Sequence, residues 1–555
     1  MARLICGAAA VTLLAMACLI WVHGRLAGSG PAPERSTVDP LDEGTGPIGA
    51  SAEDGWVSFA GGRLRYRQDV QRNRVPDFSQ VGYHGGDAAI PTVPVRASLN
   101  AMPAGDDTAR IQAAIDEVAR SGQPGAVQLG PGAYRLVSTV NVNSGGVVLR
   151  GSGSGSGGTT LVGVGAPHVL VRLAGTGTPA KTGASHAVTD DYVPVGATEL
   201  TLSDVSDLVP GDRVVVARPI TQQWVHAIGM DAIPARPDGT PSTQWKAGTG
   251  LQFKRTVVAV SGHTLRLDVP LPQALEKQYT DAVVWRYVFP GRVREVGLES
   301  LAADGQAFAA DPTWHDKGYF DSQLVVVDAA EESWVRDVVA QHFGAAFTVG
   351  AEALRVSVLD TASLDESVPQ DITAQPMAYT VAGQQSLVAR CRVTGSNLHA
   401  WVTESRTAGP NVFTRCTATN TGNRKIDAGP HQRWAAGTLY DAMTMDGSGM
   451  LRLEDRQWQG TGQGWAGAND VLWNCSVGTY HLENPPTAHN WAFGCTGNLE
   501  PPAAGHRSGE VVSDGAHVAP ESLYEQQLAD RRAGRPAGLT VEPAVEERAS
   551  SGPVG

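Results

Sequence analysis

The residues best suited to chemistry lie between positions 427 and 441, in the run Asp-Ala-Gly-Pro-His-Gln-Arg-Trp-Ala-Ala-Gly-Thr-Leu-Tyr-Asp. His431 can carry a proton near neutral pH, and Arg433 can pair with a carboxylate. Lys425 adds positive charge nearby, in a chain that is acidic as a whole. This run predicts a site for an anionic ligand, with His431, Arg433 and Asp441 as catalytic candidates and Lys425 as a substrate-binding candidate.

A repeat in the second half of the chain relates this run to its neighbours. Cys391, Cys416 and Asp441 are equally spaced, at close to the length that one coil of stacked strands needs. Cys475 and Cys495 stand in similar local sequences, which predicts one cysteine per coil. Neighbouring coils are about 4.8 Å apart, so stacked free thiols and one or two disulfides both remain open.

The same register predicts a column of functional side chains. Ten residues before three of the repeat positions lie Arg406, His431 and Trp465, and His399 falls one coil before His431. An aromatic platform, a cation and an imidazole suit a sugar chain that carries carboxylates. We therefore expect Arg406, His399 and Trp465 to bind substrate. The alternative is that the basic side chains bond backbone carbonyls and that Trp465 simply covers the core.

Asp365 and Glu366 form a second candidate set, with Asp360 and Asp371 close by in the sequence. Paired carboxylates act as acid and as base or nucleophile in glycosidases, and their oxygens also bind Ca²⁺. No run of residues has the spacing of a metal site, so a requirement for calcium is left open. A solvated acidic loop is the alternative interpretation.

Short strands and glycine-rich turns must position these residues. Residues 106–120 predict a helix, because Ile111, Ile115 and Val118 fall at helical spacing. Runs of Val and Leu from 126 to 150 then predict strands only a few residues long. Glycine contributes 65 of the 555 residues, which fits a fold with many turns. A helix followed by such strands is typical of a capped coil of parallel strands.

Three pieces of sequence carry a resemblance to a known superfamily. They are Asp107-Thr-Ala-Arg-Ile-Gln-Ala-Ala-Ile-Asp, Leu129-Gly-Pro-Gly-Ala-Tyr and Val148-Leu-Arg-Gly-Ser-Gly. These pieces resemble the opening of right-handed parallel β-helix proteins of the pectate-lyase-like superfamily, especially its rhamnogalacturonase/epimerase-like branch. The resemblance implies an all-β solenoid and a polysaccharide as the substrate class. It fixes no single activity, because the superfamily holds lyases, hydrolases, epimerases and phage tailspikes.

The composition of the chain changes along its length. We expect an export signal or N-terminal anchor at 1–25, a linker and lead-in at 26–70, β-helix at 71–187, an inserted β-rich domain at 188–290, β-helix again at 291–500, and a short capping helix with a disordered tail at 501–555. The first assignment rests on an unbroken apolar run from Leu4 to Val22. It predicts a secreted protein, with membrane contact only through an uncleaved N-terminal segment.

The net charge of the chain excludes one class of binding partner. The formal net charge is −13 and no basic block occurs, which argues against a nucleic acid partner. We expect an exported lyase that cleaves a uronic-acid-containing glycan by β-elimination, with His431 as base and with Arg433 and Arg406 pairing the substrate carboxylate. The alternatives are a glycoside hydrolase that uses Asp365 or Glu366 with a second acid, and a glycan-binding or surface β-helix protein without activity.

Overall fold

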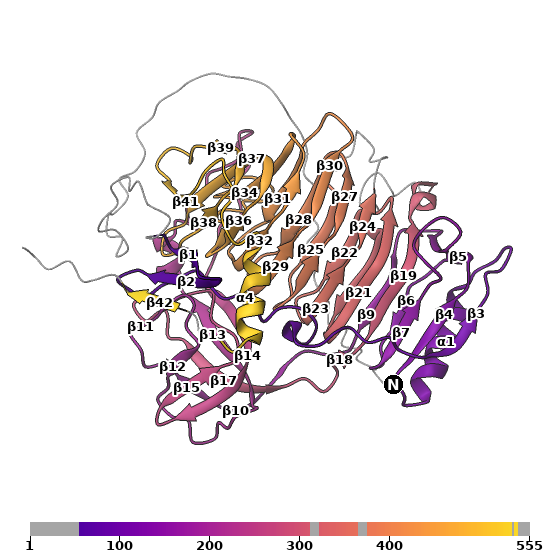
Figure 1. The fold of residues 1–555 in the computed structure, drawn as a ribbon, viewed down its shortest axis with the longest axis horizontal. Coiled ribbons are helices and arrows are strands. Elements are labelled where there is room, and N and C mark those ends of the chain that lie inside the picture. The colour runs from indigo at the N-terminus through magenta and orange to yellow at the C-terminus, as the bar shows by residue number, and fades with distance from the viewer. Residues whose placement is uncertain (1–54, 311–320, 365–374, 536–537, 542–555) are drawn as a thin grey trace, which may run out of the picture.

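The computed structural model describes residues 55–310, 321–364, 375–535 and 538–541. Most of these residues wind as a right-handed parallel β-helix, whose strands lie in stacked layers across Figure 1. Asp365 and Glu366, together with the predicted leader at 1–25, lie outside the described residues. No helix in the described ranges is long and apolar enough to cross a membrane.

The β-helix has three faces, each a ladder of parallel strands from successive coils. The first face consists of β3 (Val95–Leu99), β4 (Gly125–Leu129), β7 (Val147–Arg150), the first half of β19 (Gly297–Asp304), the first half of β21 (Ala330–Gln341), β23 (Leu354–Leu359), β26 (Leu387–Ala389), β29 (Ala408–Thr414), β32 (Ala435–Asp441), β36 (Val471–Trp473), β38 (Trp491–Phe493) and β41 (Glu510–Val512). Two short strands, β18 (Val293–Arg294) and β35 (Gly467–Ala468), pair at its edge.

The other two faces complete each coil. The second consists of β5 (Gly132–Leu136), β8 (Thr159–Gly163), the second halves of β19 and β21, β24 (Ala362–Leu364), β27 (Arg392–Gly395), β30 (Thr417–Asn420), β33 (Thr444–Met445) and the start of β37 (Ser476–Asn484). The third consists of β6 (Val140–Val142), β9 (Val169–Ala174), β20 (Gln323–Asp328), β22 (Ala345–Val349), β25 (Met377–Val381), β28 (Leu398–Thr403), β31 (Ile426–Pro430), β34 (Gly449–Leu453) and the rest of β37, which also pairs with β39 (Thr496–Glu500).

A continuous apolar core fills the coils. Inward side chains stack on those of the next coil: the rings of Phe347 and Tyr379 lie 4.7 Å apart, and those of Phe413 and Tyr440 lie 5.2 Å apart. The helix predicted at 106–120 is α1 (Thr108–Arg120), which covers the open end of the first coils with its buried apolar side (Figure 1). Because parallel strands leave the core exposed at a terminal coil, such a cap stabilises the solenoid.

The cysteine stack is present and its thiols are free. Cys391, Cys416, Cys475 and Cys495 are all buried and unpaired by disulfides. Asp441 does not share their column, because its strand register aligns it with Thr414 and not with Cys416. Coil length varies with the loops between strands, so a step of fixed length drifts out of register here.

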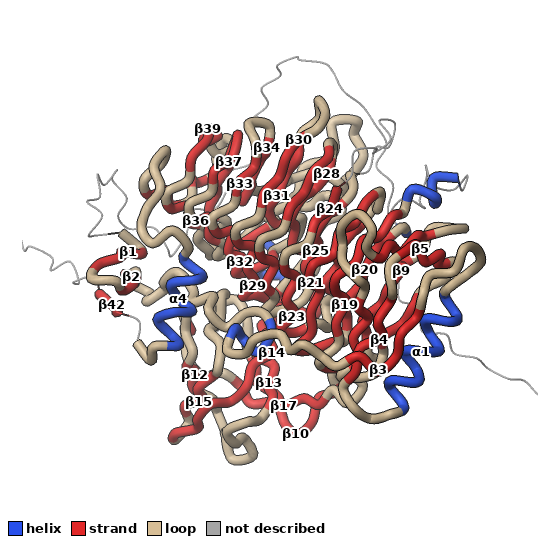
Figure 2. Tube along the Cα trace, turned by 45° about the vertical axis from the view of Figure 1, so that its right-hand side comes forward, coloured by secondary structure: helices blue, strands red, loops and turns tan. Residues whose placement is uncertain are grey.

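An antiparallel β insert leaves the solenoid after β9. Its main sheet has the order β10 (Ala180–Ala187), β17 (Val283–Val288), β13 (Arg213–Ile220), β14 (Gly248–Ser261), β15 (Thr264–Leu267) and β12 (Glu199–Thr201), beside the pair β11 (Tyr192–Val193) and β16 (Leu275–Glu276) and the short α2 (Gln222–Ala227). Because β10 belongs to this sheet, the insert begins at Ala180 and not at 188. In Figures 1 and 2 it lies along one side of the β-helix.

The two ends of the described chain meet on the first face. The lead-in packs there with α4 (Leu523–Arg532) through a shared apolar cluster that includes Phe78, Val81 and Leu523. The hairpin β1 (Val57–Ala60) and β2 (Arg63–Gln68) pairs with β42 (Gly538–Val541), so part of the predicted linker and of the predicted disordered tail is ordered strand. Beyond residue 500 the solenoid also continues through β41, and the two-residue β40 (Arg507–Ser508) pairs with β37.

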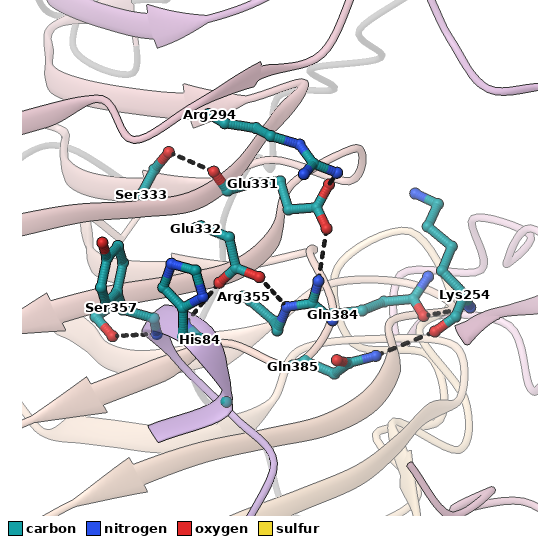
Figure 3. Close-up of polar contacts among 12 residues, drawn as sticks. His84, Lys254, Arg294, Glu331, Glu332, Ser333, Arg355, Ser357, Gln384 and Gln385 are labelled. Atoms are coloured by element: carbon teal, nitrogen blue, oxygen red, sulfur yellow. Dashed lines mark hydrogen bonds and ion pairs between the residues drawn. The ribbon is translucent and has the colours of Figure 1, made fainter. Parts of the chain in front are cut away.

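Buried charge joins the insert and the lead-in to the solenoid. Glu331 is fully buried on β21 and accepts hydrogen bonds from Arg213 of the insert at 2.6 and 2.9 Å. Arg294 and Arg355 of neighbouring coils bond the same carboxylate at 2.8 and 2.6 Å (Figure 3). Next to it, the Glu332 carboxylate accepts the His84 backbone N–H of the lead-in at 2.6 Å (Figure 3). This network holds the insert and the lead-in to β21 of the solenoid.

Candidate functional site

The predicted base, His431, lies just beyond the end of β31, where the third face turns toward the insert. Burial, together with the neighbouring His399 and Arg456, lowers its pKa well below the usual range, so the ring is neutral at pH 7. Its Nδ1 lies 3.1 Å from Arg456 Nη1, and Arg456 also donates to the His431 carbonyl at 2.8 Å. An arginine only donates, so Nδ1 is the acceptor and the ring proton sits on Nε2.

The second ring nitrogen of His431 is also occupied. Nε2 lies 3.0 Å from the side-chain amide of Gln463. Because Nε2 carries the proton, the amide orientation that suits this contact presents Oε1, an atom that otherwise has no partner in the described chain. With both nitrogens used inside the protein, His431 has no lone pair for substrate. The structure supports its positioning role and not the predicted role as base.

His399, predicted only to bind substrate, has 7 % of its side chain exposed and has the better hydrogen-bond geometry for proton transfer. It pairs in register with Asp427 across β28 and β31, and its Nδ1 forms a short contact with the Asp427 carboxylate. Its Nε2 has no hydrogen-bond partner among the described residues. Burial alone would raise the pKa of Asp427, but His399 and Arg456 lower it to about 2. A carboxylate on Nδ1–H leaves the lone pair on Nε2, which is the tautomer that a general base needs.

Arg406 and Arg433 lie side by side on neighbouring coils, at the corner where the third face meets the insert. The Arg406 backbone N–H donates to the Arg433 carbonyl at 3.0 Å. Their side chains reach only neutral acceptors: Arg406 the Thr249 carbonyl at 3.4 Å, and Arg433 the Thr461 hydroxyl at 3.3 Å and a backbone carbonyl at 3.1 Å. Burial and the charge of Arg406 lower the pKa of Arg433. Neither guanidinium has a carboxylate partner among the described residues.

The register corrects the predicted column of Arg406, His431 and Trp465. The Arg406 N–H donates to the Arg433 carbonyl, and the next paired residues are Ala408 and Ala436, so Arg406 is aligned with Trp434 and not with His431. The Trp434 N–H in turn donates to the Trp465 carbonyl at 2.8 Å, which aligns Trp434 with Ala466. Trp465 is only 5 % exposed and packs in the cluster between the insert and the solenoid. Its ring is packed within this cluster and lies 5.0 Å from the ring of His506, so Trp465 covers the core, as the alternative interpretation expected.

Two glutamates flank His431 along the same edge. Thr403 is paired with Pro430 and Ala428 with Leu451, so the register carried onward aligns Glu404, His431 and Glu454 on three successive coils. Two coil spacings place the Cα atoms of the glutamates about 9.6 Å apart. Glu404 accepts a hydrogen bond from the Gln432 amide at 3.2 Å, and Glu454 accepts one from Arg452 at 3.3 Å. Burial lowers the pKa of Arg456, and the charges of both carboxylates oppose that effect.

Asp441, a predicted catalytic residue, has a structural role. It is fully buried and accepts hydrogen bonds from Thr414 at 2.8 Å, from the Ser522 hydroxyl and from the Leu523 N–H at 2.9 Å. Since Ser522 caps α4, this carboxyl ties the C-terminal helix to the solenoid. No substrate reaches a side chain in this position.

We predict a distinctive pH dependence for Asp441. Burial, opposed by the hydrogen bonds from Ser522, Thr414 and Leu523, raises its pKa to about 6. The folded state therefore binds more protons than the unfolded state between pH 4 and 6, and stability falls as the pH rises. Asp441→Asn removes this dependence. Between pH 4 and pH 7 the unfolding free energy of the variant, measured with urea, should therefore rise by about 3 kcal/mol relative to that of the wild type. Parallel curves for the two proteins would contradict the assignment.

The remaining predicted residues do not join this group. Lys425 is exposed and precedes β31, whereas His431 follows the same strand. Asp365 and Glu366 lie outside the described residues, so the acidic set is not placed. Within the described ranges, no group of three or more His, Cys, Asp or Glu side chains is arranged to hold a metal ion.

Sequence reasoning missed Asp427 as the partner of His399, although it opened the run that was singled out. It also missed Arg456 and Gln463, which lie on the following coil and contact His431 only through the fold. The signal that could have found Asp427 is its position 28 residues after His399, about one coil. Arg456 offers no such signal, because a long loop separates it from the next strand.

By sequence, the chain matches no known protein family and no curated protein. By structure it is similar to the tailspike gp49 of Pseudomonas phage LKA1 (14 % identity, 74 % of this chain and 70 % of that one, TM-score 0.39) and to the tailspike of E. coli bacteriophage HK620 (10 %, 76 % and 66 %, 0.37). A pectin methylesterase in complex with a hexasaccharide is also similar (10 %, 79 % and 98 %, 0.30). The matched region spans 59 % of ORF18 of Geobacillus virus E2. These likenesses concern the fold, and the parallel β-helix that the sequence resemblance implied is the architecture of this chain.

Proposed function

We propose that the chain binds a uronic-acid-containing polysaccharide along the edge of the third face and cleaves it by β-elimination. One observation carries the proposal: Arg406 and Arg433 adjoin without a carboxylate partner in the described chain. They follow β28 and β31, the two strands that carry His399 and Asp427. Two adjacent cations repel each other unless an anion lies between them. A uronate carboxylate would supply that anion, held by charge-assisted hydrogen bonds.

The chemistry follows from these groups. In β-elimination the carbon next to the carboxylate loses a proton, the bond to the glycosidic oxygen breaks, and a carbon–carbon double bond remains in the product. His399 Nε2 would accept the proton, and Asp427 would stabilise the imidazolium that forms. The proton taken up by His399 then passes to the leaving oxygen, directly or through water, so atoms and charge balance and His399 returns to its neutral form. The polysaccharide as substrate class comes from the sequence resemblance, whereas the preference for an anion comes from the arginine pair.

Hydrolysis is a second candidate because of Glu404 and Glu454. Their Cα separation of about 9.6 Å across two coils is compatible with the wide carboxylate spacing of inverting glycosidases. In that reaction one carboxylic acid protonates the leaving oxygen, and the other activates water. Both reactions would use the same arginine pair for an acidic glycan, so the product distinguishes them.

The arginine pair provides the test of the proposed ligand. With Arg406→Ala/Arg433→Ala, the Kd for an oligogalacturonide should rise at least tenfold, about 1.4 kcal/mol. Its dependence on salt should also weaken, because two charge contacts to the carboxylate are lost from the site. Isothermal titration at two ionic strengths measures both effects.

A matched control for this test is Arg120→Ala, which removes an exposed arginine at the end of α1. This variant should bind like the wild-type protein. If the double variant and the wild type bind the acidic oligosaccharide equally, the arginine pair is not the anion site.

A further inference from the structure

A cavity of about 550 Å³ lies at the junction of the lead-in and the insert, away from the residues of the proposed site. Residues 68–74 of the lead-in form one wall, and residues 190–199 of the insert form the other. The walls are fixed to each other, because Asn73 accepts the Val195 N–H at 2.9 Å and the Tyr192 hydroxyl at 3.0 Å. The volume falls in the range of small-ligand sites.

A buried acceptor on the lead-in wall points to a ligand. Gln71 lines the cavity, and its Oε1 is buried without a hydrogen-bond donor in the described chain. Such an acceptor costs free energy unless a donor is supplied, and a ligand hydroxyl would supply it. Arg72, also on this wall, has a φ of 68°, a left-handed conformation that costs energy for a residue with a side chain. Its exposed side chain lines the same cavity.

The lining matches a neutral, hydroxyl-rich ligand. Arg72 and Arg74 are balanced by Asp190 and Glu199, so the cavity has no net charge. Planar amide, guanidinium and carboxylate groups can bond the paired hydroxyls of a sugar. Tyr192 adds an aromatic ring, which suits the apolar face of a sugar unit.

We propose that this cavity is a second saccharide-binding site, which takes a neutral sugar unit of the polymer. The proposal deepens the proposed function, because it names a second point of contact for the same substrate. It differs from the arginine pair in the charge of what it binds. A polymer held at both places would have to carry neutral as well as acidic sugars.

Two variants test this site, and each keeps the fold. Gln71→Ala removes the amide. Arg72→Gly removes the guanidinium and accepts a positive φ, while glycine adds freedom to the unfolded chain, so its Tm should stay close to that of the wild type. Binding of neutral hexasaccharides from galactan, xylan, mannan and glucan to the full chain is measured by isothermal titration. We expect at least one of them to bind, with a Kd that rises tenfold or more in each variant.

The controls separate this proposal from the proposed function. Arg65→Ala, an exposed arginine of β2 that does not line the cavity, and Arg406→Ala/Arg433→Ala should both leave the neutral-sugar Kd unchanged. Binding to none of the four hexasaccharides, or binding that survives both cavity variants, would overturn the second site. Loss of turnover in a His399 variant with neutral-sugar binding intact would show that the two sites are independent.

Discussion

Replacing His399 with alanine is expected to lower kcat on an acidic glycan by a factor of roughly 10² to 10⁴, the usual contribution of a positioned general base. Asp427 fixes the tautomer of His399 through Nδ1, so Nε2 is the atom that lacks a protein partner in the described chain. KM should change little, because the arginine pair holds the substrate.

Matched variants make this prediction specific. Asp427→Asn should also lower kcat, because an amide favours the wrong tautomer. His226→Ala, at an exposed position of the insert, should leave kcat unchanged. His431→Gln should affect stability more than kcat, since both of its ring nitrogens are bonded inside the protein. If His431→Gln lowers kcat by this factor and His399→Ala does not, the base is misassigned.

Replacing Glu331 with glutamine is expected to lower the free energy of unfolding by about 3–5 kcal/mol, because a buried carboxylate is removed from between several arginines. Arg213 bonds both of its oxygens, and Arg294 and Arg355 add further hydrogen bonds. The neutral amide keeps the shape of the side chain and leaves these cations uncompensated. Because Arg213 belongs to the insert, the insert should detach from the solenoid more readily.

The pH dependence of this contribution has a definite sign. Burial alone would raise the pKa of Glu331, but Arg213, Arg355 and Arg292 lower it to about 2. A carboxyl whose pKa is depressed in the folded state stabilises the protein above its unfolded pKa, near 4.5. That stabilisation, roughly 3 kcal/mol, is lost as the pH falls from about 4.5 to 2. Wild type and Glu331→Gln should therefore converge in stability at low pH.

Urea unfolding at pH 7 and at pH 3 measures this effect. Glu117→Gln, which replaces an exposed glutamate on α1, is the control. A surface substitution of this kind should change the unfolding free energy by no more than about 0.5 kcal/mol. A Glu331→Gln protein as stable as the wild type at pH 7 would show that the network adds no net stability.

Much of the architecture was predictable because it repeats. The helix at 106–120 followed from helical spacing, and the solenoid followed from short strands with glycine-rich turns. The cysteines shared a column because each follows a first-face strand by the same number of residues. Local patterns of this kind depend on neighbouring residues, which a single sequence displays directly.

The residues of the site were harder to assign, because coil lengths vary. A fixed step aligned Arg406 with His431, whereas loops of different length align it with Trp434, beside Arg433. The burial of two candidates could not be predicted from their residue types either. Trp465 suits a sugar platform, but the insert covers it, and Asp441 suits a catalytic acid, but α4 covers it. Covering elements that lie far away in sequence leave no local signal.

The product formed from an acidic polysaccharide tests the central claim most directly. Purified full-length protein is incubated with polygalacturonate and other uronate glycans, and absorbance in the ultraviolet and new reducing ends are followed together. Elimination predicts that both rise in step for at least one substrate, and that His399→Ala abolishes both. Reducing ends without absorbance would establish hydrolysis instead, and no turnover of any uronate glycan would contradict the enzymatic account.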